Sequence, residues 1–193
     1  MKSRAVDVTS NNIANASTNG FRASKQSFEA LVVDTGSDDQ MSKMAYAIDK
    51  GTYNDLSEGA VVQTGNPFDV AIQGDGFFAY ERTDGRIAIG RDGNLSRSPE
   101  GELVTVSGHR ILNNGGAPIN VPADAGAISI APDGTVSTAA NGAIDQIGAF
   151  SEPGAARWQK IDGGMMVPRE GEPALIPALD VTIRQGFSET SNV

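Results

Sequence analysis

His109 is the one histidine in the 193-residue chain, so a Ser-His-Asp triad would depend on it alone. It lies in Ser107-Gly108-His109-Arg110, between two strand-like runs, where it could act as a general base toward Ser107 or a distant serine. No nucleophile-elbow motif accompanies it, and a histidine in a loop or edge strand needs no catalytic role. We therefore expect no catalytic residue, with a small β-rich hydrolase that uses His109 as an alternative.

Other groups that could hold a ligand are sparse. The chain has no cysteine, which excludes thiolate metal sites and disulfides. Two acidic clusters, at residues 38–39 and 170–172, could attract a cation, but solvated loops explain them better. The Asp-Gly pairs lack the spacing of an EF-hand, and neither glycine-rich phosphate-binding motif is present. The sequence predicts no metal and no cofactor.

The charge of the chain is uneven. The net charge is −9, which disfavours a nucleic-acid partner because phosphate binding draws on an excess of Lys and Arg. Residues 1–25 carry a net charge of +3, so the remainder carries −12. A basic arm on an acidic body suggests head-to-tail or arm-to-body association, although chance can give a short segment such a charge. No stretch is long enough to span a membrane, and no secretory signal is visible.

A first element is expected at residues 3–16, which read as a helix with a thin apolar stripe formed by Val6 and Ile13. Such a helix is marginal in water without packing. Residues 15–20, rich in Asn, Ser and Gly, end it, and their amides are suited to capping or to hydrogen bonds between subunits. The helix therefore resembles one half of a pair whose partner lies outside the chain.

The rest of the chain favours β structure. Residues 21–60 read as a long extended connector with short strands, in which Phe21 and Phe28 anchor the connector or belong to the core. From residue 61, short β-prone runs alternate with turn dipeptides such as Asp84-Gly85 and Asp133-Gly134. This pattern predicts a mainly β fold, with an antiparallel all-β central domain at residues 61–187, an N-terminal helix and a long extended connector.

Five strings in one order then resemble the motifs of the flagellar rod and hook protein family. They lie at residues 10–21 (SNNIANASTNGF), 63–78 (QTGNPFDVAIQGDGFF), 91–95 (RDGNL) followed by 101–105 (GELVT), 131–137 (APDGTVS) and 185–193 (QGFSETSNV). They span nearly the whole chain, and the pattern is most similar to proximal rod subunits. The resemblance implies a structural subunit, exported without a cleaved signal peptide by the flagellar type III pathway, in the periplasm-spanning rod of the basal body. A distal rod subunit and a secreted β-rich adhesin or binding module are the alternatives.

The resemblance also implies a division of the chain and a set of assembly residues. Residues 1–20 hold the helix and assembly signature, 21–60 the connector, 61–187 the rod domain, and 188–193 the start of a carboxy-terminal axial segment. Relative to family members both helical ends are short, so the chain is expected to be monomeric or weakly associating. Its expected partners are other axial rod proteins, by head-to-tail and lateral contacts, and the export apparatus. The expected interface residues are Val6, Asn11, Asn12, Ile13, Asn15, Phe21, Ser191, Asn192 and Val193.

Overall fold

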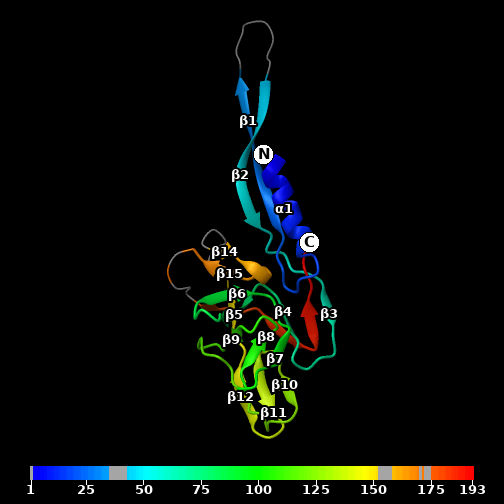
Figure 1. The fold of residues 1–193 in the computed structure, drawn as a ribbon, viewed down its shortest axis with the longest axis vertical. Coiled ribbons are helices and arrows are strands. Elements are labelled where there is room, and N and C mark those ends of the chain that lie inside the picture. Colours follow the sequence, from blue (N-terminus) through cyan, green and yellow to red (C-terminus); the bar gives the residue numbers. More distant parts are fainter. Residues whose placement is uncertain (1, 35–42, 152–157, 170, 172–174) are drawn as a thin grey trace.

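A computed structural model describes residues 2–34, 43–151, 158–169, 171 and 175–193. These described residues contain one α-helix, one short 3-10 helix and a large number of antiparallel strands, which confirms the predicted mainly β fold. The molecule is elongated, with a narrow projection at one end and a β-rich mass at the other (Figure 1). In the described residues, no helix is long and apolar enough to cross a membrane.

The narrow projection, which we call the arm, consists of α1 (Lys2–Ala14), β1 (Ser24–Asp34) and β2 (Lys43–Asn54). The two strands pair antiparallel, with a register shift between Ser27 and Phe28. Helix α1 lies beside this hairpin, and its carboxyl end points toward the β-rich mass (Figure 1). The helix ends near the predicted Asn-rich stretch, since the Asn15 N–H still donates to the Asn11 carbonyl at 3.2 Å.

The arm differs from the extended connector that the sequence suggested. An unpaired connector would leave its backbone N–H and C=O groups to water or to a partner. Instead, β1 and β2 have 11 and 12 residues and satisfy one another along a continuous ladder. The predicted short strands are therefore two long ones. Alternating side chains revealed the extended conformation, but not which segment each strand pairs with.

The β-rich mass, which we call the body, contains the remaining elements. Its strands are β3 (Val61–Gln63), β4 (Val70–Gln73), β5 (Phe77–Glu81), β6 (Ile87–Gly90), β7 (Leu95–Arg97), β8 (Leu103–Thr105), β9 (Arg110–Ile111), β10 (Ile128–Ile130), β11 (Thr135–Thr138), β12 (Gly142–Gln146), β13 (Ala149–Ser151), β14 (Trp158–Lys160), β15 (Met166–Pro168), β16 (Ile176–Pro177), β17 (Thr182–Gln185) and β18 (Phe187–Glu189). The 3-10 helix η2 (Asp162–Gly164) lies between β14 and β15.

Several small sheets make up the body. The largest runs in the order β14-β15-β6-β5-β9-β8-β7, with β13 and β16 attached beside β5. A second sheet has the order β10-β11-β12. The last two strands return to the start of the body, because β17 pairs with β4 and β18 pairs with β3. The carboxyl end of the chain is therefore built into the body beside its first strands.

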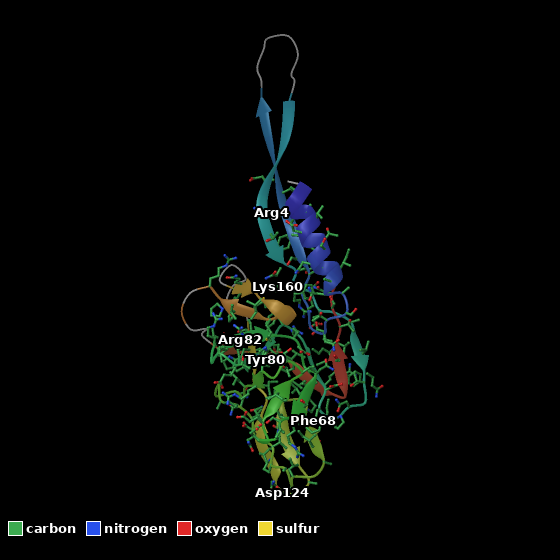
Figure 2. The ribbon with its side chains drawn as sticks, in the orientation of Figure 1. Arg4, Phe68, Tyr80, Arg82, Asp124 and Lys160 are labelled. Atoms are coloured by element: carbon green, nitrogen blue, oxygen red, sulfur yellow. The ribbon has the colours of Figure 1, made fainter. Side chains whose placement is uncertain are left out.

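The core of the body is apolar and closely packed. Phe78 and Tyr80 on β5 are completely buried and meet edge to face, with ring centroids 6.5 Å apart. Tyr80, labelled in Figure 2, donates its hydroxyl to the Asp92 carbonyl at 2.6 Å, and its burial raises the pKa of the phenol well above the ordinary value. Trp158 on β14 is 3% exposed and also belongs to the core.

Only some of the Asp-Gly pairs join two strands that pair with one another. Asp84-Gly85 and Asp133-Gly134 do connect paired strands, β5 with β6 and β10 with β11. In contrast, Asp92-Gly93 leads from β6 to β7, which do not pair with one another. Gly93 is needed there because a Cβ atom would lie 1.7 Å from the Val70 carbonyl oxygen. Asp75-Gly76 likewise separates β4 and β5, which lie in different sheets.

Candidate functional site

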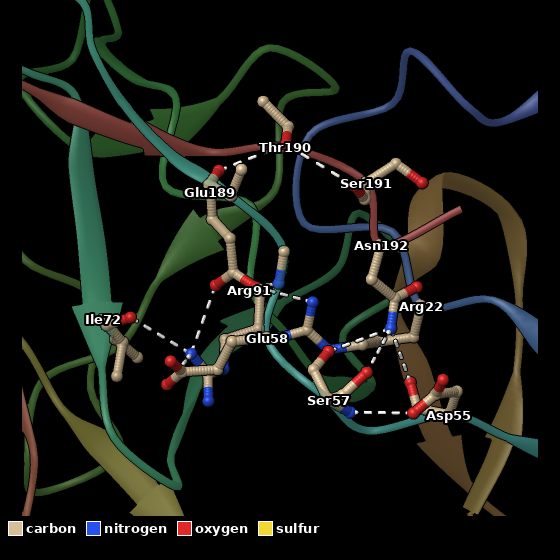
Figure 3. A network of polar contacts seen from close by, with 12 residues as sticks. Arg22, Asp55, Ser57, Glu58, Ile72, Arg91, Glu189, Thr190, Ser191 and Asn192 are labelled. Atoms are coloured by element: carbon tan, nitrogen blue, oxygen red, sulfur yellow. Dashed lines mark hydrogen bonds and ion pairs between the residues drawn. The ribbon is translucent and has the colours of Figure 1, made fainter.

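Three charged side chains meet inside the junction between arm and body. Glu189, at the end of β18, lies 2.6 Å from Arg22 Nη1 through Oε1 and 3.2 Å from Arg91 Nη1 through Oε2. The side chains are 0%, 2% and 2% exposed, respectively, so the ion pairs are shielded from solvent. We call these residues the buried triad (Figure 3). They come from the segment after α1, from the loop after β6 and from the last strand.

Arg91 extends the triad into the body. Its Nη1 donates to the Ile72 carbonyl at 3.1 Å and its Nη2 donates to the Gly74 carbonyl at 2.6 Å. A second carboxylate, that of Glu58, lies 3.6 Å from Nη1 (Figure 3). Burial is the main cause that lowers the pKa of Arg91, and the Glu189 carboxylate opposes this by favouring the charged form. Arg91 therefore ties the end of β4 to the triad.

The backbone closes tightly around Glu189. The Gly59 N–H donates to Glu189 Oε1 at 2.8 Å, and the Gly20 N–H donates to the Glu189 carbonyl at 2.9 Å. Neither glycine has room for a side chain: a Cβ at Gly20 would lie 2.4 Å from the backbone of Arg91, and a Cβ at Gly59 would lie 1.9 Å from the Thr190 carbonyl oxygen. Together with the ion pairs, these contacts pack three other segments of the chain against Glu189.

Asn192 joins the same segments through its amide. Its Oδ1 accepts the Ala23 N–H at 2.6 Å, and its Nδ2 donates to the carbonyls of Asp55 at 3.0 Å and Ser57 at 2.9 Å (Figure 3). Its own N–H donates to the Phe21 carbonyl at 3.3 Å. One amide near the carboxyl end therefore fixes the strand that leaves α1 and the strand that returns from the arm.

A similar amide pair attaches the helix to the hairpin. Asn12 donates from Nδ2 to the Ser24 carbonyl at 2.8 Å and accepts the Ser24 N–H at 2.9 Å. This two-bond contact has the geometry of one rung of a β ladder. Asn15 instead donates to the Asn11 carbonyl at 2.9 Å within the helix. The end of α1 is thus fixed to the first residue of β1.

Lys160 closes the junction from the body side. Its ammonium nitrogen lies 3.3 Å from the centroid of the Phe21 ring and donates to the Arg22 carbonyl. Desolvation by burial lowers the pKa of this lysine to about 8. A polar pocket of about 360 Å³ lies beside it, lined by Asn11, Asn15, Phe21, Ser24, Lys160, Ile161 and Gly163.

The predicted interface residues fall into two groups. Val6, Ile13 and Val193 are 62%, 68% and 54% exposed, and Asn11 is exposed as well. Phe21 is 2% exposed and belongs to the core, which was one of the two alternatives predicted for it. The remaining residues are partly buried and bond within the chain, namely Asn12, Asn15, Ser191 and Asn192. Their role between subunits stays a prediction.

Among the described residues, the candidates for catalysis and cation binding are not assembled into a site. His109 lies in the turn between β8 and β9, where its Nδ1 has no hydrogen-bond partner among the described residues, and burial lowers its pKa. In this part of the chain, no three His, Cys, Asp or Glu residues are grouped to hold a metal. The cluster at residues 38–39 lies outside the described residues, as do two of the three positions at 170–172.

Sequence reasoning did not single out the buried triad or Lys160. Arg91 and Glu189 both lie inside motifs quoted for the family resemblance, and Arg22 follows the motif that ends at Phe21. A charged residue inside such a motif, next to an aromatic residue or a glycine, was the signal in the sequence that could have indicated a buried ion pair. Pairing Arg22 with Glu189 requires the fold, because 167 positions of the sequence separate them.

The polar groups of this site fix an arm to a β body and hold distant segments of the chain together, which is the arrangement of a structural subunit. Comparison of the sequence with known proteins supports the same class. The sequence profile of the flagellar hook protein FlgE/F/G D1 domain matches residues 71–138, and that of the flagella basal body rod protein matches residues 2–22. The first profile covers about half of the body, from β4 to β11, and the second covers α1 and continues to the triad residue Arg22.

Individual relatives extend this match over the whole chain. The flagellar basal-body rod protein FlgF of Mesorhizobium japonicum is 37% identical over 191 residues, which cover 98% of this chain and 76% of the relative. FlgF of Salmonella typhimurium is 34% identical, covering 96% and 76%. FlgG of Bacillus subtilis, also a flagellar basal-body rod protein, is 37% identical over 68% of this chain and 54% of its own.

The chain therefore belongs to the flagellar basal-body rod protein family. It is a structural subunit of the bacterial flagellar rod, and the prediction of a proximal rod protein is confirmed, since FlgF is the proximal and FlgG the distal rod protein. Association with other flagellar rod proteins follows from membership of the family.

Proposed function

We propose that the chain is a noncatalytic building block whose arm packs against neighbouring rod proteins while its body stiffens the rod. One observation carries this proposal: the arm is fixed to the body by a triad whose three side chains are at most 2% exposed. A subunit that transmits torque needs such a joint, because a flexible joint between its parts would absorb the rotation. The match to basal-body rod proteins supports the same role.

The proposed packing face of the arm is the outer side of α1. Val6 and Ile13 are seven residues apart, so they lie on one side of the helix, and both are more than 60% exposed. Covering an exposed valine or isoleucine contributes about 1.5–3 kcal/mol per side chain. Asn11, also exposed and on α1, would add a polar contact. Val193, which is exposed as well, would add an apolar contact. These residues are the proposed head-to-tail and lateral contacts.

The buried members of the predicted set would act differently. Asn12, Phe21 and Asn192 bond or pack within the chain, so we propose that they present the arm in a fixed orientation. The proposed division of the chain stays at 1–20, 21–60, 61–187 and 188–193. Export through the flagellar type III apparatus without a cleaved signal peptide, and a place in the periplasm-spanning rod, complete the proposal.

The test is deletion of the gene in its own host, followed by imaging of detergent-extracted basal bodies and scoring of swimming. We expect non-motile cells whose particles stop at rings with a short or absent rod and no hook. Complementation with V6S/I13S should restore few complete rods, whereas V106S, at an exposed position of the body, should restore them fully. Normal hooks and swimming in the deletion strain would refute the function.

A further inference from the structure

A pocket of about 360 Å³ lies at the joint between arm and body, beside Lys160. Figure 2 shows Lys160 at the end of the body that faces the arm. The lining comes from both parts, with Asn11 and Asn15 at the end of α1, Phe21 and Ser24 at the entry to β1, and Lys160, Ile161 and Gly163 from the body. We call it the joint pocket. Among these lining residues Lys160 is the one that carries a charge.

Lys160 is a partly buried cation for which the described residues supply no counter-ion. Its ammonium has three N–H groups. One of them donates to the Arg22 carbonyl, and the nitrogen lies 3.3 Å from the centroid of the Phe21 ring. Burial lowers the pKa of Lys160 to about 8, and no carboxylate of the described part opposes this effect. A donor and a positive charge are therefore left over at the edge of the pocket.

A second lysine at the base of the arm shows the contrast. Lys25 Nζ lies 2.6 Å from Asp55 Oδ2, and the hydrogen bond between them is the main cause that raises the pKa of Lys25. The chain as a whole has a net charge of −9, so it holds more carboxylates than cations. A lysine that lacks a carboxylate in such a chain suits a carboxylate from another molecule.

Neutral donors surround the remaining space of the joint pocket. Asn11 is exposed, and its side-chain amide has no hydrogen bond within the described part of the chain. Asn15 donates one N–H to the Asn11 carbonyl at 2.9 Å, which leaves the second N–H of its amide. One cation with neutral donors matches a single negative charge, whereas phosphate groups are typically held by arginines. Phe21 and Ile161 give the pocket an apolar side for the carbon chain that carries the charge.

We propose that the joint pocket binds a carboxylate, with Lys160 as its counter-ion and the amides of Asn11 and Asn15 as further donors. The carboxylate belongs either to a small organic acid or to an acidic side chain of a second copy of this chain, since the same groups recognise both. Hydrogen bonds between an ammonium and a carboxylate are roughly twice as strong as neutral ones. This ligand site is additional to the proposed function and does not depend on it.

Binding at the joint pocket would stabilise the joint itself. Lys160 also holds the Arg22 carbonyl, and the Arg22 side chain pairs with Glu189 in the buried triad. A carboxylate beside the ammonium offsets the desolvation cost that burial imposes on this charge. A ligand that binds the folded chain alone shifts the folding equilibrium by mass action. The pocket therefore couples a carboxylate ligand to the attachment of the arm on the body.

The test measures the pKa of Lys160 by side-chain carbon NMR on the full chain. Sodium acetate and sodium glutarate are compared with sodium chloride at equal ionic strength, and K160Q identifies the signal. We expect a saturable rise of the Lys160 pKa, by about 1 when acetate reaches ten times its dissociation constant, because the ammonium binds and the neutral amine does not. Lys25, which already has its carboxylate, is the control within the same spectra and should not respond. N11A should weaken acetate binding about 2- to 10-fold, as the loss of one hydrogen bond implies.

Two further measurements identify the source of the carboxylate. If a second copy supplies it, the pKa of Lys160 rises with protein concentration in chloride alone. A carbodiimide then couples the Lys160 amine to an aspartate or glutamate of another chain as an amide, and the carbodiimide takes up the water that is released. If a small organic acid is the ligand, the added acid raises the pKa and protein concentration has no effect.

The remaining outcomes overturn the proposal. A Lys160 pKa that is the same in acetate, glutarate and chloride, and at every protein concentration, would show that the pocket binds no carboxylate. Equal responses of Lys160 and Lys25 would show an adventitious ion only. Acetate binding that N11A leaves unchanged would refute the role of the amides. All of these measurements use the isolated chain, so they are independent of the rods and swimming by which the proposed function is judged.

Discussion

Removing the negative charge of the buried triad should destabilise the whole chain. The substitution is E189Q, which keeps the size of the side chain and an oxygen that can accept the Gly59 N–H. What is lost is the charge that faces Arg22 at 2.6 Å and Arg91 at 3.2 Å. Both arginine side chains are 2% exposed; among the described residues Arg22 is left without a counter-ion, and Arg91 keeps only the Glu58 carboxylate at 3.6 Å.

The magnitude follows from burial. Breaking a buried ion pair by neutralising one partner costs about 3–5 kcal/mol, because the remaining charge keeps its desolvation penalty. Total stabilities of globular domains are about 5–15 kcal/mol, so this is a large share. For a chain of this length each kcal/mol moves the unfolding midpoint by about 2–4 °C, which predicts a decrease of about 6–20 °C.

The assay is thermal and urea unfolding followed by circular dichroism. The matched control is D84N, the same change of carboxylate to amide at an exposed pair with Arg86, whose side chains are 39% and 68% exposed. The control should move the midpoint by no more than about 2 °C, because solvent screens exposed ion pairs.

A double variant separates charge from packing. R22M/E189Q should regain part of the loss, because one of the two stranded cations is gone and its volume is kept. If E189Q unfolds at the same urea concentration as the unmodified chain, or if D84N is as damaging, the triad does not hold the junction and the reasoning is refuted.

Three further predictions concern single sites. The pKa of Asp55 is about 2, chiefly because Lys25 hydrogen-bonds to its carboxylate, so the stability that Asp55 contributes is complete above the ordinary pKa of 3.8 and is lost as the pH falls toward 2. K25Q should raise the pKa of Asp55 in a carboxyl-carbon NMR titration, and an unchanged pKa would contradict this cause. The amine of Lys160 should titrate near pH 8, so its partly buried charge destabilises the fold below pH 8, and the free energy of unfolding rises between pH 8 and the ordinary lysine pKa of 10.5. This rise should be absent in K160M, and a rise that remains in K160M would belong to another group. G93A places a Cβ 1.7 Å from the Val70 carbonyl oxygen and should lower the free energy of unfolding in urea by about 1–3 kcal/mol or more. G115A should lower it clearly less, because the atom nearest to its Cβ is a side-chain oxygen at 3.3 Å, and equal effects of the two substitutions would argue against close packing at residue 93.

The fold class was accessible from the sequence because its signals are local. Alternating apolar residues and turn dipeptides report backbone conformation within a few residues, so the β body and the amino-terminal helix followed directly. Pairing is different, because it depends on contacts between distant segments. The hairpin of β1 and β2 and the return of β17 to β4 were not visible in the pattern.

The candidate site shows a sharper limit. Exposed Val6 and Ile13 could be inferred from a stripe too thin to hold a helix, which is a local property. The triad could not, because a charged residue in a sequence normally indicates solvent, and only the fold shows that Arg22 and Glu189 are buried together. Asn192 was selected from a family motif, and its amide clamp within the chain became visible only with the neighbouring backbone in place.

The clamp of Asn192 also determines when the molecule can fold. Its bond to Ala23 connects residues 169 positions apart, and the triad has a similar sequence separation. Contacts between residues so far apart in the sequence form late and slowly, because the conformational entropy of the intervening chain is lost before the contact stabilises the fold. The joint between arm and body is therefore complete on a nascent chain only when residues 189–192 are available. A chain passing amino end first through a narrow channel would complete this joint only after those residues had emerged.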